Sequence, residues 1–311
     1  MIWKPIVAGV DASPQAATAA AFAWQIAQAA GTECYFVHGT RPLFRAAATT
    51  EFVSDVSLLI EQQIEAARMG VSATLERAIP AAALRTLEIR SGRGATVVTE
   101  AAGEYHAGLI VLGGKHHTTL GRWMGGSTAH HVVRVTDIPL LVTGETVEAM
   151  RRILISADLS YAVGPTFEAA ARMARLFGAE LRVLHAVEPL PVFAEMPALW
   201  NEEAFYQDSR AQFERCLEPL LGGTAAEPVV RRGYATDVIA AEVAAWGADL
   251  VVVGSHGKGW VDRLLLGSTT ERLLDQLPAS LLVVPVPAPP GERRAGRARW
   301  ARPAATSPPA G

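Results

Sequence analysis

Short apolar runs alternate with longer stretches of helical periodicity along most of the chain. In the first half, the apolar runs of strand length cover residues 6–10, 34–38, 87–91, 109–113 and 140–143. Between them, the periodicity predicts helices over about residues 14–30, 52–69, 95–104 and 126–136. Strands that are almost continuously apolar and are separated by helices are typical of a parallel sheet covered on both faces. The pattern therefore predicts a doubly wound α/β fold.

The second half of the chain repeats the first. The segment IVAGVDAS, which contains Asp11, aligns with ILISADLS, which contains Asp158, at an offset of 158 − 11 = 147 positions. The segment CYFVHGT aligns with LRVLHAV at the same offset, so that His38 matches His185. Each copy therefore carries an aspartate after its first strand and a histidine in its second.

Further along the chain, the offset between the two copies changes to 254 − 113 = 141 positions. AGLIVLGG at 107–114 aligns with ADLVVVGS at 248–255, and GGS at 125–127 aligns with LGS at 266–268. A length difference therefore lies between the second and the fourth strand of each copy. Four matches in the same order indicate an internal duplication.

The duplication predicts two doubly wound, parallel-sheet domains in tandem. We place the first domain at residues 1–147 and the second at residues 148–287. Residues 288–311 are rich in proline, arginine and alanine and lack apolar periodicity, so we expect a disordered tail there.

Composition and charge narrow the class of protein. Of the 311 residues, 50% are hydrophobic and 19% are charged, which indicates well-buried cores. The net charge of −3 gives no general attraction for nucleic acid. No apolar run approaches the roughly 18–20 residues that cross a bilayer, and the N-terminal residues do not resemble a secretory signal. We therefore expect a cytoplasmic protein without membrane or nucleic-acid partners, in which Cys34 and Cys216 are small buried side chains.

A glycine-rich segment of the second copy carries the most specific chemical signal. It follows an apolar strand and runs from Gly254 through Gly257 to Gly267, Ser268 and Thr269, where a helix begins. The glycines permit close approach to the backbone, and the free N–H groups and dipole of a helix N-terminus attract phosphate. An ordinary glycine-rich turn with a serine cap is the alternative. The position after a strand favours an anion site, because ligands of doubly wound sheets bind at the carboxyl ends of the strands.

This segment resembles the glycine motif of the universal stress protein family. In ATP-binding members the motif is glycine, two residues, glycine, nine residues, then glycine and serine, and this segment fits that spacing in full. The resemblance covers roughly residues 1–145 and 150–287. It implies two Rossmann-like, adenine-nucleotide alpha hydrolase-like domains, and it implies pairing of the last strands, at 139–143 and 281–284, into a compact pseudo-dimer.

The resemblance also implies an ATP site in the second domain, with or without Mg²⁺. A carboxylate at Asp158 suits two neighbouring hydroxyl donors, so it would bind the ribose hydroxyls or lie beside the adenine. The backbone of Ala186 would meet the adenine. The full set of implied nucleotide-binding residues is Asp158, Ala186, Val253, Gly254, His256, Gly257, Gly267, Ser268 and Thr269.

The first copy departs from the motif at one position. Gly113, Gly126 and Ser127 fit, but His116 stands where the second glycine belongs, and a side chain there would crowd a phosphate. We expect weak or absent ATP binding in this copy, although Gly114 could shift the turn. Because Asp11 remains in place, the copy keeps a degenerate site that could take a smaller or differently posed ligand.

The histidines raise a metal hypothesis that the spacing does not favour. The adjacent pairs His116 with His117 and His130 with His131 point in different directions, and no cysteine or carboxylate completes a recognisable ligand set. We expect no metal site, and we interpret the strand histidines of the two copies as structural.

The leading hypothesis is a stress-response protein that binds ATP in its second domain and acts through ligand-dependent conformation or partner binding. The alternatives are a nucleotide-free interaction scaffold and a slow ATP-hydrolysing enzyme. No catalytic motif occurs in its required context, so we expect no dedicated catalysis. A homodimer formed through other surfaces remains compatible with the sequence.

Overall fold

The computed structural model describes residues 3–41, 53–114, 128–144, 150–160, 162–189, 201–255 and 266–286. The tail at 288–311 lies outside these ranges. The first repeat contains β1 (Ile6–Gly9), α1 (Pro14–Ala30), β2 (Cys34–Thr40), α2 (Val53–Leu75), a 3₁₀ helix (Ala81–Thr86), β3 (Leu87–Ser91), α3 (Gly94–Glu104), β4 (Leu109–Gly113), α4 (Thr128–Val135) and β5 (Leu140–Thr143).

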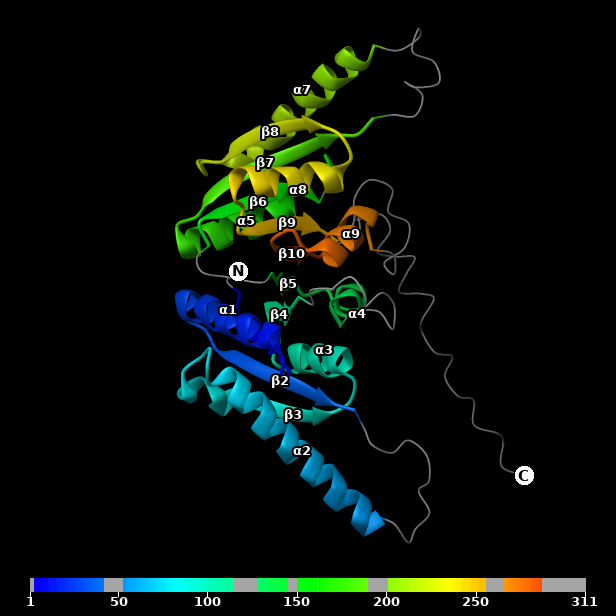
Figure 1. The fold of residues 1–311 in the computed structure, drawn as a ribbon. Helices are drawn as coiled ribbons and strands as arrows, with labels where there is room; N and C mark the ends of the chain where they lie inside the picture. Colours follow the sequence, from blue (N-terminus) through cyan, green and yellow to red (C-terminus); the bar gives the residue numbers. More distant parts are fainter. Residues whose placement is uncertain are drawn as a thin grey trace, which may run out of the picture.

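The second repeat follows the same plan, as Figure 1 shows. Its elements are β6 (Arg152–Ser156), α5 (Val163–Phe177), β7 (Glu180–Val187), α7 (Glu202–Leu221), β8 (Glu227–Arg232), α8 (Ala235–Trp246), β9 (Leu250–Gly254), α9 (Ser268–Gln276) and β10 (Ser280–Val284).

One sheet runs through both repeats. Within the described ranges it has ten strands in the order β3-β2-β1-β4-β5-β10-β9-β6-β7-β8. The pairs inside each repeat are parallel, which confirms two tandem doubly wound domains, and β5 and β10 pair antiparallel at the junction. Leu141 is the register partner of Leu282, its own counterpart at the offset of 141 positions. The two domains are therefore related by a pseudo-two-fold axis at this pair of leucines.

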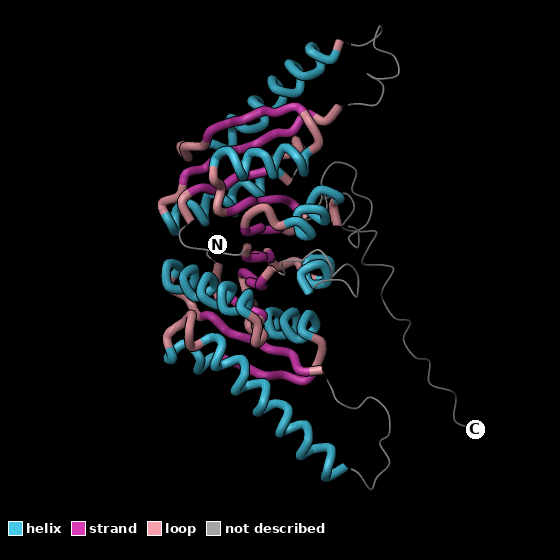
Figure 2. The backbone as a smooth tube through the Cα atoms, in the orientation of Figure 1, coloured by secondary structure: helices cyan, strands magenta, loops and turns pink. Residues whose placement is uncertain are grey.

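Helices cover both faces of the sheet (Figure 2). On one face, a buried cluster joins the strands to α1 and α5 through side chains such as Phe22 and Phe167, and on the other a second cluster joins them to α3 and α8 through Val98 and Ile239. Both clusters contain residues of β5 and of β10. Each hydrophobic core is therefore continuous across the domain boundary.

The bounds of α1 follow from local sequence signals. The hydroxyl of Ser13 accepts a hydrogen bond from the backbone N–H of Ala16, and Pro14 occupies the first turn, where its missing N–H costs nothing. Gly31 ends the helix at φ 59°, a left-handed conformation that favours glycine. This helix brings Asp11 and Ser13 to the carboxyl end of β1.

The two cysteines differ in burial. Cys34 is buried in β2, as expected, and its burial raises the pKa of the thiol to about 12. The expectation for Cys216 is wrong, because this residue is exposed on α7. The buried positions of α7 are Phe213 and Leu217, so the helix buries only a narrow stripe that excludes Cys216.

No helix in the described part of the chain is long and apolar enough to cross a membrane.

A polar and aromatic cluster lies at the outer edge of the first domain. The rings of Tyr35 and Tyr105 stack with centroids 3.9 Å apart, and the hydroxyl of Tyr105 donates a hydrogen bond to Glu88. Arg90 forms ion pairs with Glu88 at 2.6 Å and with Glu104 at 2.8 Å. Burial alone would raise the pKa of Glu88, but the hydrogen bonds from Tyr105 and Arg90 prevail and lower this pKa.

We expect Tyr105→Phe to lower the free energy of unfolding by about 1.5–3 kcal/mol at neutral pH, because one hydrogen bond to a carboxylate is lost. A carboxylate whose pKa is lowered by folding contributes stability above its unfolded pKa, near 4.5 for Glu88, and loses it as the pH falls through the folded pKa. The deficit of the variant should therefore shrink between pH 7 and about pH 3 in urea unfolding. Tyr35→Phe is the comparison variant, because it keeps the hydrogen bond to Glu88 and removes only the exposed one from Tyr35 to Glu33, so its loss at neutral pH should be smaller. Equal deficits at both pH values would contradict the prediction.

Candidate functional site

A cavity of about 530 Å³ lies at the carboxyl ends of β6, β7 and β9 in the second domain. It is lined by seven of the nine residues that the sequence predicts for nucleotide binding, namely Asp158, Ala186, Val253, Gly254, Gly267, Ser268 and Thr269. The other two, His256 and Gly257, lie outside the described residues. The fold thus gathers residues from segments more than a hundred positions apart around one cavity.

Asp158 is held by the turn that follows β6. Its Oδ1 accepts hydrogen bonds from the backbone N–H of Ser160 at 3.0 Å and from the Ser160 hydroxyl at 2.6 Å. The same hydroxyl accepts from the N–H of Ala162 at 3.1 Å, and Leu159 has a left-handed backbone with φ 60°. In the described chain, both turn contacts of Asp158 are made by Oδ1. The turn therefore fixes the carboxylate, and Oδ2 can accept hydrogen bonds from a ligand in the cavity.

His185 supports the wall of the cavity. Its Nδ1 lies 2.8 Å from the carbonyl oxygen of Ala157, which can only accept, so Nδ1 carries the proton. The ring is buried and stacks on Phe213 with centroids 5.5 Å apart. In the first domain, Nδ1 of His38 donates to the carbonyl of Val10 in the same way, at 2.7 Å. These contacts agree with structural roles for both strand histidines.

The N-terminus of α9 opens into the cavity. Gly267 is the N-cap residue, and because glycine has no side chain, the N-cap residue itself does not cap the helix. The backbone N–H of Gly267 donates to Ser255 at 3.0 Å, and the hydroxyl of Thr270 donates to the carbonyl of Gly254 at 2.9 Å, which ties the helix to the end of β9. Thr270 was missed by the sequence reasoning. The first turn of α9, with Ser268 and Thr269, is thus positioned to offer N–H and hydroxyl donors to an anion.

The described charges of the cavity are acidic. Asp158, Glu188 and Asp208 line it, and none of its described lining residues is lysine or arginine. Glu188 already accepts a hydrogen bond from the N–H of Ala235 at the start of α8, at 3.0 Å. Carboxylates suit hydroxyl donors or a divalent cation, whereas the first turn of α9 offers donors to a phosphate group. The basic residues of the glycine segment, Lys258 and Arg263, lie outside the described ranges.

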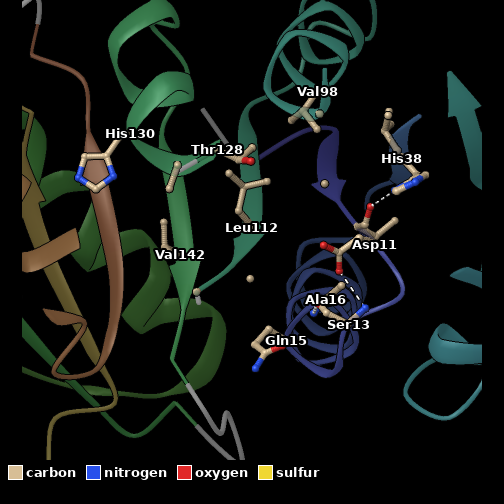
Figure 3. A pocket seen from close by; sticks show the side chains of 18 of the residues that line it. Asp11, Ser13, Gln15, Ala16, His38, Val98, Leu112, Thr128, His130 and Val142 are labelled. Carbon is tan, nitrogen blue, oxygen red and sulfur yellow. Dashed lines mark hydrogen bonds between the residues drawn. The ribbon is translucent and has the colours of Figure 1, made fainter. Parts of the chain in front are cut away.

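The first domain has a smaller cavity, of about 280 Å³, at the equivalent place (Figure 3). It is lined by Asp11 and Gly113, whereas Gly126 and Ser127 of the predicted degenerate site lie outside the described residues. The Oδ1 of Asp11 accepts from the backbone N–H of Ser13 at 2.9 Å, as the turn at Asp158 does in the second domain.

Packing explains both glycines at the end of β4. A Cβ at Gly113 would come within 2.7 Å of the carbonyl oxygen of Gln15 in α1. A Cβ at Gly114 would come within 2.6 Å of the carbonyl oxygen of Thr143 in β5 and within 2.4 Å of the Cδ1 of Leu277, which belongs to the second domain. Close packing therefore requires glycine at both positions whether or not a ligand binds.

Two of the four histidines of the metal hypothesis, His130 and His131, lie on the described helix α4. His130 on α4 lies 3.4 Å from the carboxylate of Asp275 on α9, and His131 is exposed. His116 and His117 lie outside the described residues. No group of three potential metal ligands occurs among the residues whose positions are described.

Comparison with known sequences gives matches in both halves of the chain. The model of the universal stress protein family matches residues 3–144 and again residues 150–285. A protein of Thermus aquaticus, described as "Universal stress protein in QAH/OAS sulfhydrylase 3'region", is 31% identical over 136 residues, which are 43% of this chain and 98% of that protein. The "Universal stress protein A homolog 2" of Coxiella burnetii is 27% identical over 124 residues, 39% of this chain and 84% of that protein.

Solved structures resemble the whole tandem arrangement. A universal stress protein from Archaeoglobus fulgidus aligns with a TM-score of 0.61 at 18% identity, covering 90% of this chain and 98% of that chain. A structure from Pseudomonas aeruginosa aligns with a TM-score of 0.59 at 16% identity, covering 90% of this chain and 92% of that one. At these identities the likeness concerns the fold.

Proposed function

Because the chain belongs to the universal stress protein family, we propose that its second domain binds an adenine nucleotide, with ATP as the physiological ligand, and acts through ligand-dependent conformation or partner binding. The observation that carries this proposal is that the start of α9, where the N-cap residue is a glycine, and the carboxylate of Asp158 line one cavity. Donors for a phosphate and an acceptor for hydroxyl groups are the two features that a nucleotide requires.

The volume and the lining of the cavity suit the parts of the ligand. Its volume of about 530 Å³ falls within the usual range for small-molecule sites. The ribose hydroxyls would donate to Asp158, and the base would lie along the backbone of Ala186 at the end of β7. The phosphates would meet the N–H groups and hydroxyls of Ser268 and Thr269. A Mg²⁺ ion, when bound with the phosphates, would neutralise part of their charge beside the carboxylates.

Calorimetric titration of the full chain with ATP tests the proposal. Wild type should bind one ATP, and Asp158→Asn should bind it about tenfold more weakly or worse, because a hydrogen bond to a charged group contributes about 1.5–3 kcal/mol. Asp11→Asn makes the same chemical change in the first domain and should bind ATP as wild type does.

Two results would contradict the proposal. Absence of ATP binding by wild type would favour the nucleotide-free scaffold. Equal ATP affinities of Asp158→Asn and wild type would mean that the nucleotide lies elsewhere.

A further inference from the structure

Helix α7 forms one side of the cavity in the second domain. Four residues that line this cavity belong to α7, namely Phe205, Asp208, Ser209 and Gln212. Their spacing of i, i+3, i+4 and i+7 places them on one face of the helix. A continuous stripe of α7 therefore faces the cavity, and three of its four side chains are polar.

The helices at the equivalent places of the two repeats differ in this respect. Figure 1 shows α2 and α7 at the two outer ends of the molecule. None of the described residues that line the cavity of the first domain belongs to α2, whereas α7 supplies four to the cavity of the second. The helical wall thus distinguishes the described lining of the second cavity, in which we place the nucleotide, from that of the first.

The order of the strands determines which part of a nucleotide α7 would meet. In the sheet, β6 lies between β9 and β7. The start of α9 follows β9 in the chain, Asp158 follows β6, and Ala186 lies at the end of β7. Phosphates, ribose and base would therefore lie in that order across three strands spaced about 4.8 Å apart. Because α7 packs against β7 and β8, its stripe borders the end of the cavity where the base would lie.

The polar side chains of the stripe differ in what they can recognise. The hydroxyl of Ser209 and the carboxamide of Gln212 can each donate and accept, so they suit a base with either an amino group or a carbonyl group at its edge. The carboxylate of Asp208 can only accept. Opposite a carbonyl group it would leave two acceptors facing each other without a donor. Asp208 is therefore the member of the stripe that can discriminate between the two kinds of base.

Asp208 is also accessible to a ligand. Its side chain is exposed, and among the described residues no hydrogen bond or ion pair engages it. The other two carboxylates of the cavity each have one oxygen in use, since Asp158 accepts from Ser160 and Glu188 accepts from Ala235. Asp208 thus keeps its full acceptor capacity for a group of the ligand.

We infer that α7 recognises the edge of the base, and that Asp208 makes the site select a purine with an amino group at position 6 over one with a carbonyl group there. The inference rests on the function proposed above. The 6-amino group of adenine would donate to Asp208, whereas the 6-carbonyl group of hypoxanthine would face it unpaired. Sites that hydrogen-bond a ligand N–H group reject the analogue that lacks it, because their polar groups are then left without partners.

Calorimetric titration of the full chain with ATP and with inosine triphosphate tests the inference. Inosine triphosphate has the same sugar and phosphates as ATP, but its purine carries a carbonyl group at position 6. Wild type should bind ATP at least about tenfold more tightly than inosine triphosphate. In Asp208→Asn the carboxamide can donate as well as accept, so the ratio of the two dissociation constants should move toward one by at least about fivefold.

Glu218→Gln is the matched control. Glu218 is exposed on α7 and is not among the described residues that line the cavity. The control therefore removes the same charge from the same helix, and its preference for ATP should equal that of wild type. Circular dichroism and thermal unfolding check that both variants fold.

The outcomes separate this inference from the proposed function. If Asp208→Asn changes the affinities for both nucleotides by the same factor, Asp208 acts only as a nearby charge and the inference is overturned. Equal affinities of wild type for the two nucleotides, or an equal loss of preference in Glu218→Gln, overturn it as well and leave ATP binding in the second domain intact. Absence of ATP binding by wild type shows instead that the proposed function is wrong, and this inference with it.

Discussion

Arg182→Ala is expected to lower the free energy of unfolding by about 3–5 kcal/mol, because it leaves a buried carboxylate without its main partner. The side chain of Glu242 is only 6% exposed, and its Oε1 accepts from Arg182 at 2.6 Å. Arg182 also binds Glu227 at 2.6 Å and lies over the ring of Trp246 at 4.4 Å. Burial alone would lower the pKa of Arg182, but the two carboxylates raise it above its ordinary value. After the substitution, the described ion pairs of Glu242 would be reduced to the one with Arg231, at 3.3 Å.

Urea unfolding of three variants distinguishes the stability contributed by the buried ion pair from that contributed by the exposed one. Glu227→Gln removes the exposed partner and should cost no more than about 1 kcal/mol. Replacing Arg182 and Glu242 together by leucine should restore most of the stability lost in Arg182→Ala, because no charge is then left buried. A loss below about 1 kcal/mol for Arg182→Ala would contradict the assignment of this pair as a buried ion pair.

The architecture could be predicted because both copies keep the same residue types at the positions where the fold requires them. Apolar strands need apolar residues on both faces, and the aspartates that close the first turn of each repeat, Asp11 and Asp158, form the same turn contact with a serine. The structure also gives the offset of 141 positions a physical meaning. Leu141 and Leu282, separated by that offset, are register partners at the pseudo-two-fold axis.

The glycine pattern could not be interpreted fully from sequence. A glycine that admits a phosphate and a glycine that admits a neighbouring side chain look the same in one sequence. Gly113 makes room for the carbonyl group of Gln15, and Gly114 makes room for the carbonyl group of Thr143 and the side chain of Leu277, so packing accounts for both glycines. The contact with Leu277 joins positions far apart in the chain, and no local sequence pattern predicts it.

Several residues that line the cavity of the second domain were not predicted from the sequence, for a different reason. Glu188, Phe205 and Asp208 line the cavity of the second domain, and they come from the end of β7 and from α7. The polar residues on the exposed side of α7 have the pattern of an ordinary solvent-exposed helix face. Only the direction of α7 over the sheet brings four of its residues to the cavity, and that direction depends on tertiary packing.

Leu282→Ala is expected to lower the free energy of unfolding by about 2–5 kcal/mol, which is the range for truncating a fully buried leucine. Leu282 is 0% exposed and sits in the antiparallel pair that joins the domains, opposite Leu141. Because each hydrophobic core is continuous through β5 and β10, the space left by the truncated side chain should destabilise both domains together. Leu141→Ala should cost a similar amount, since the axis places the two leucines in equivalent surroundings. Guanidinium unfolding, followed by circular dichroism, measures both losses.

A double-mutant cycle tests whether the two leucines share one packing site. Cross-strand neighbours on the same face of a sheet are in contact, so the losses in Leu141→Ala and Leu282→Ala should depart from additivity by about 0.5 kcal/mol or more. Leu58→Ala is the control, because Leu58 is 55% exposed on α2 and its truncation should change stability by no more than about 0.5 kcal/mol. Strict additivity of the two core substitutions would mean that the domains stabilise each other through other contacts. The pseudo-two-fold axis would then be a feature of geometry without an energetic role.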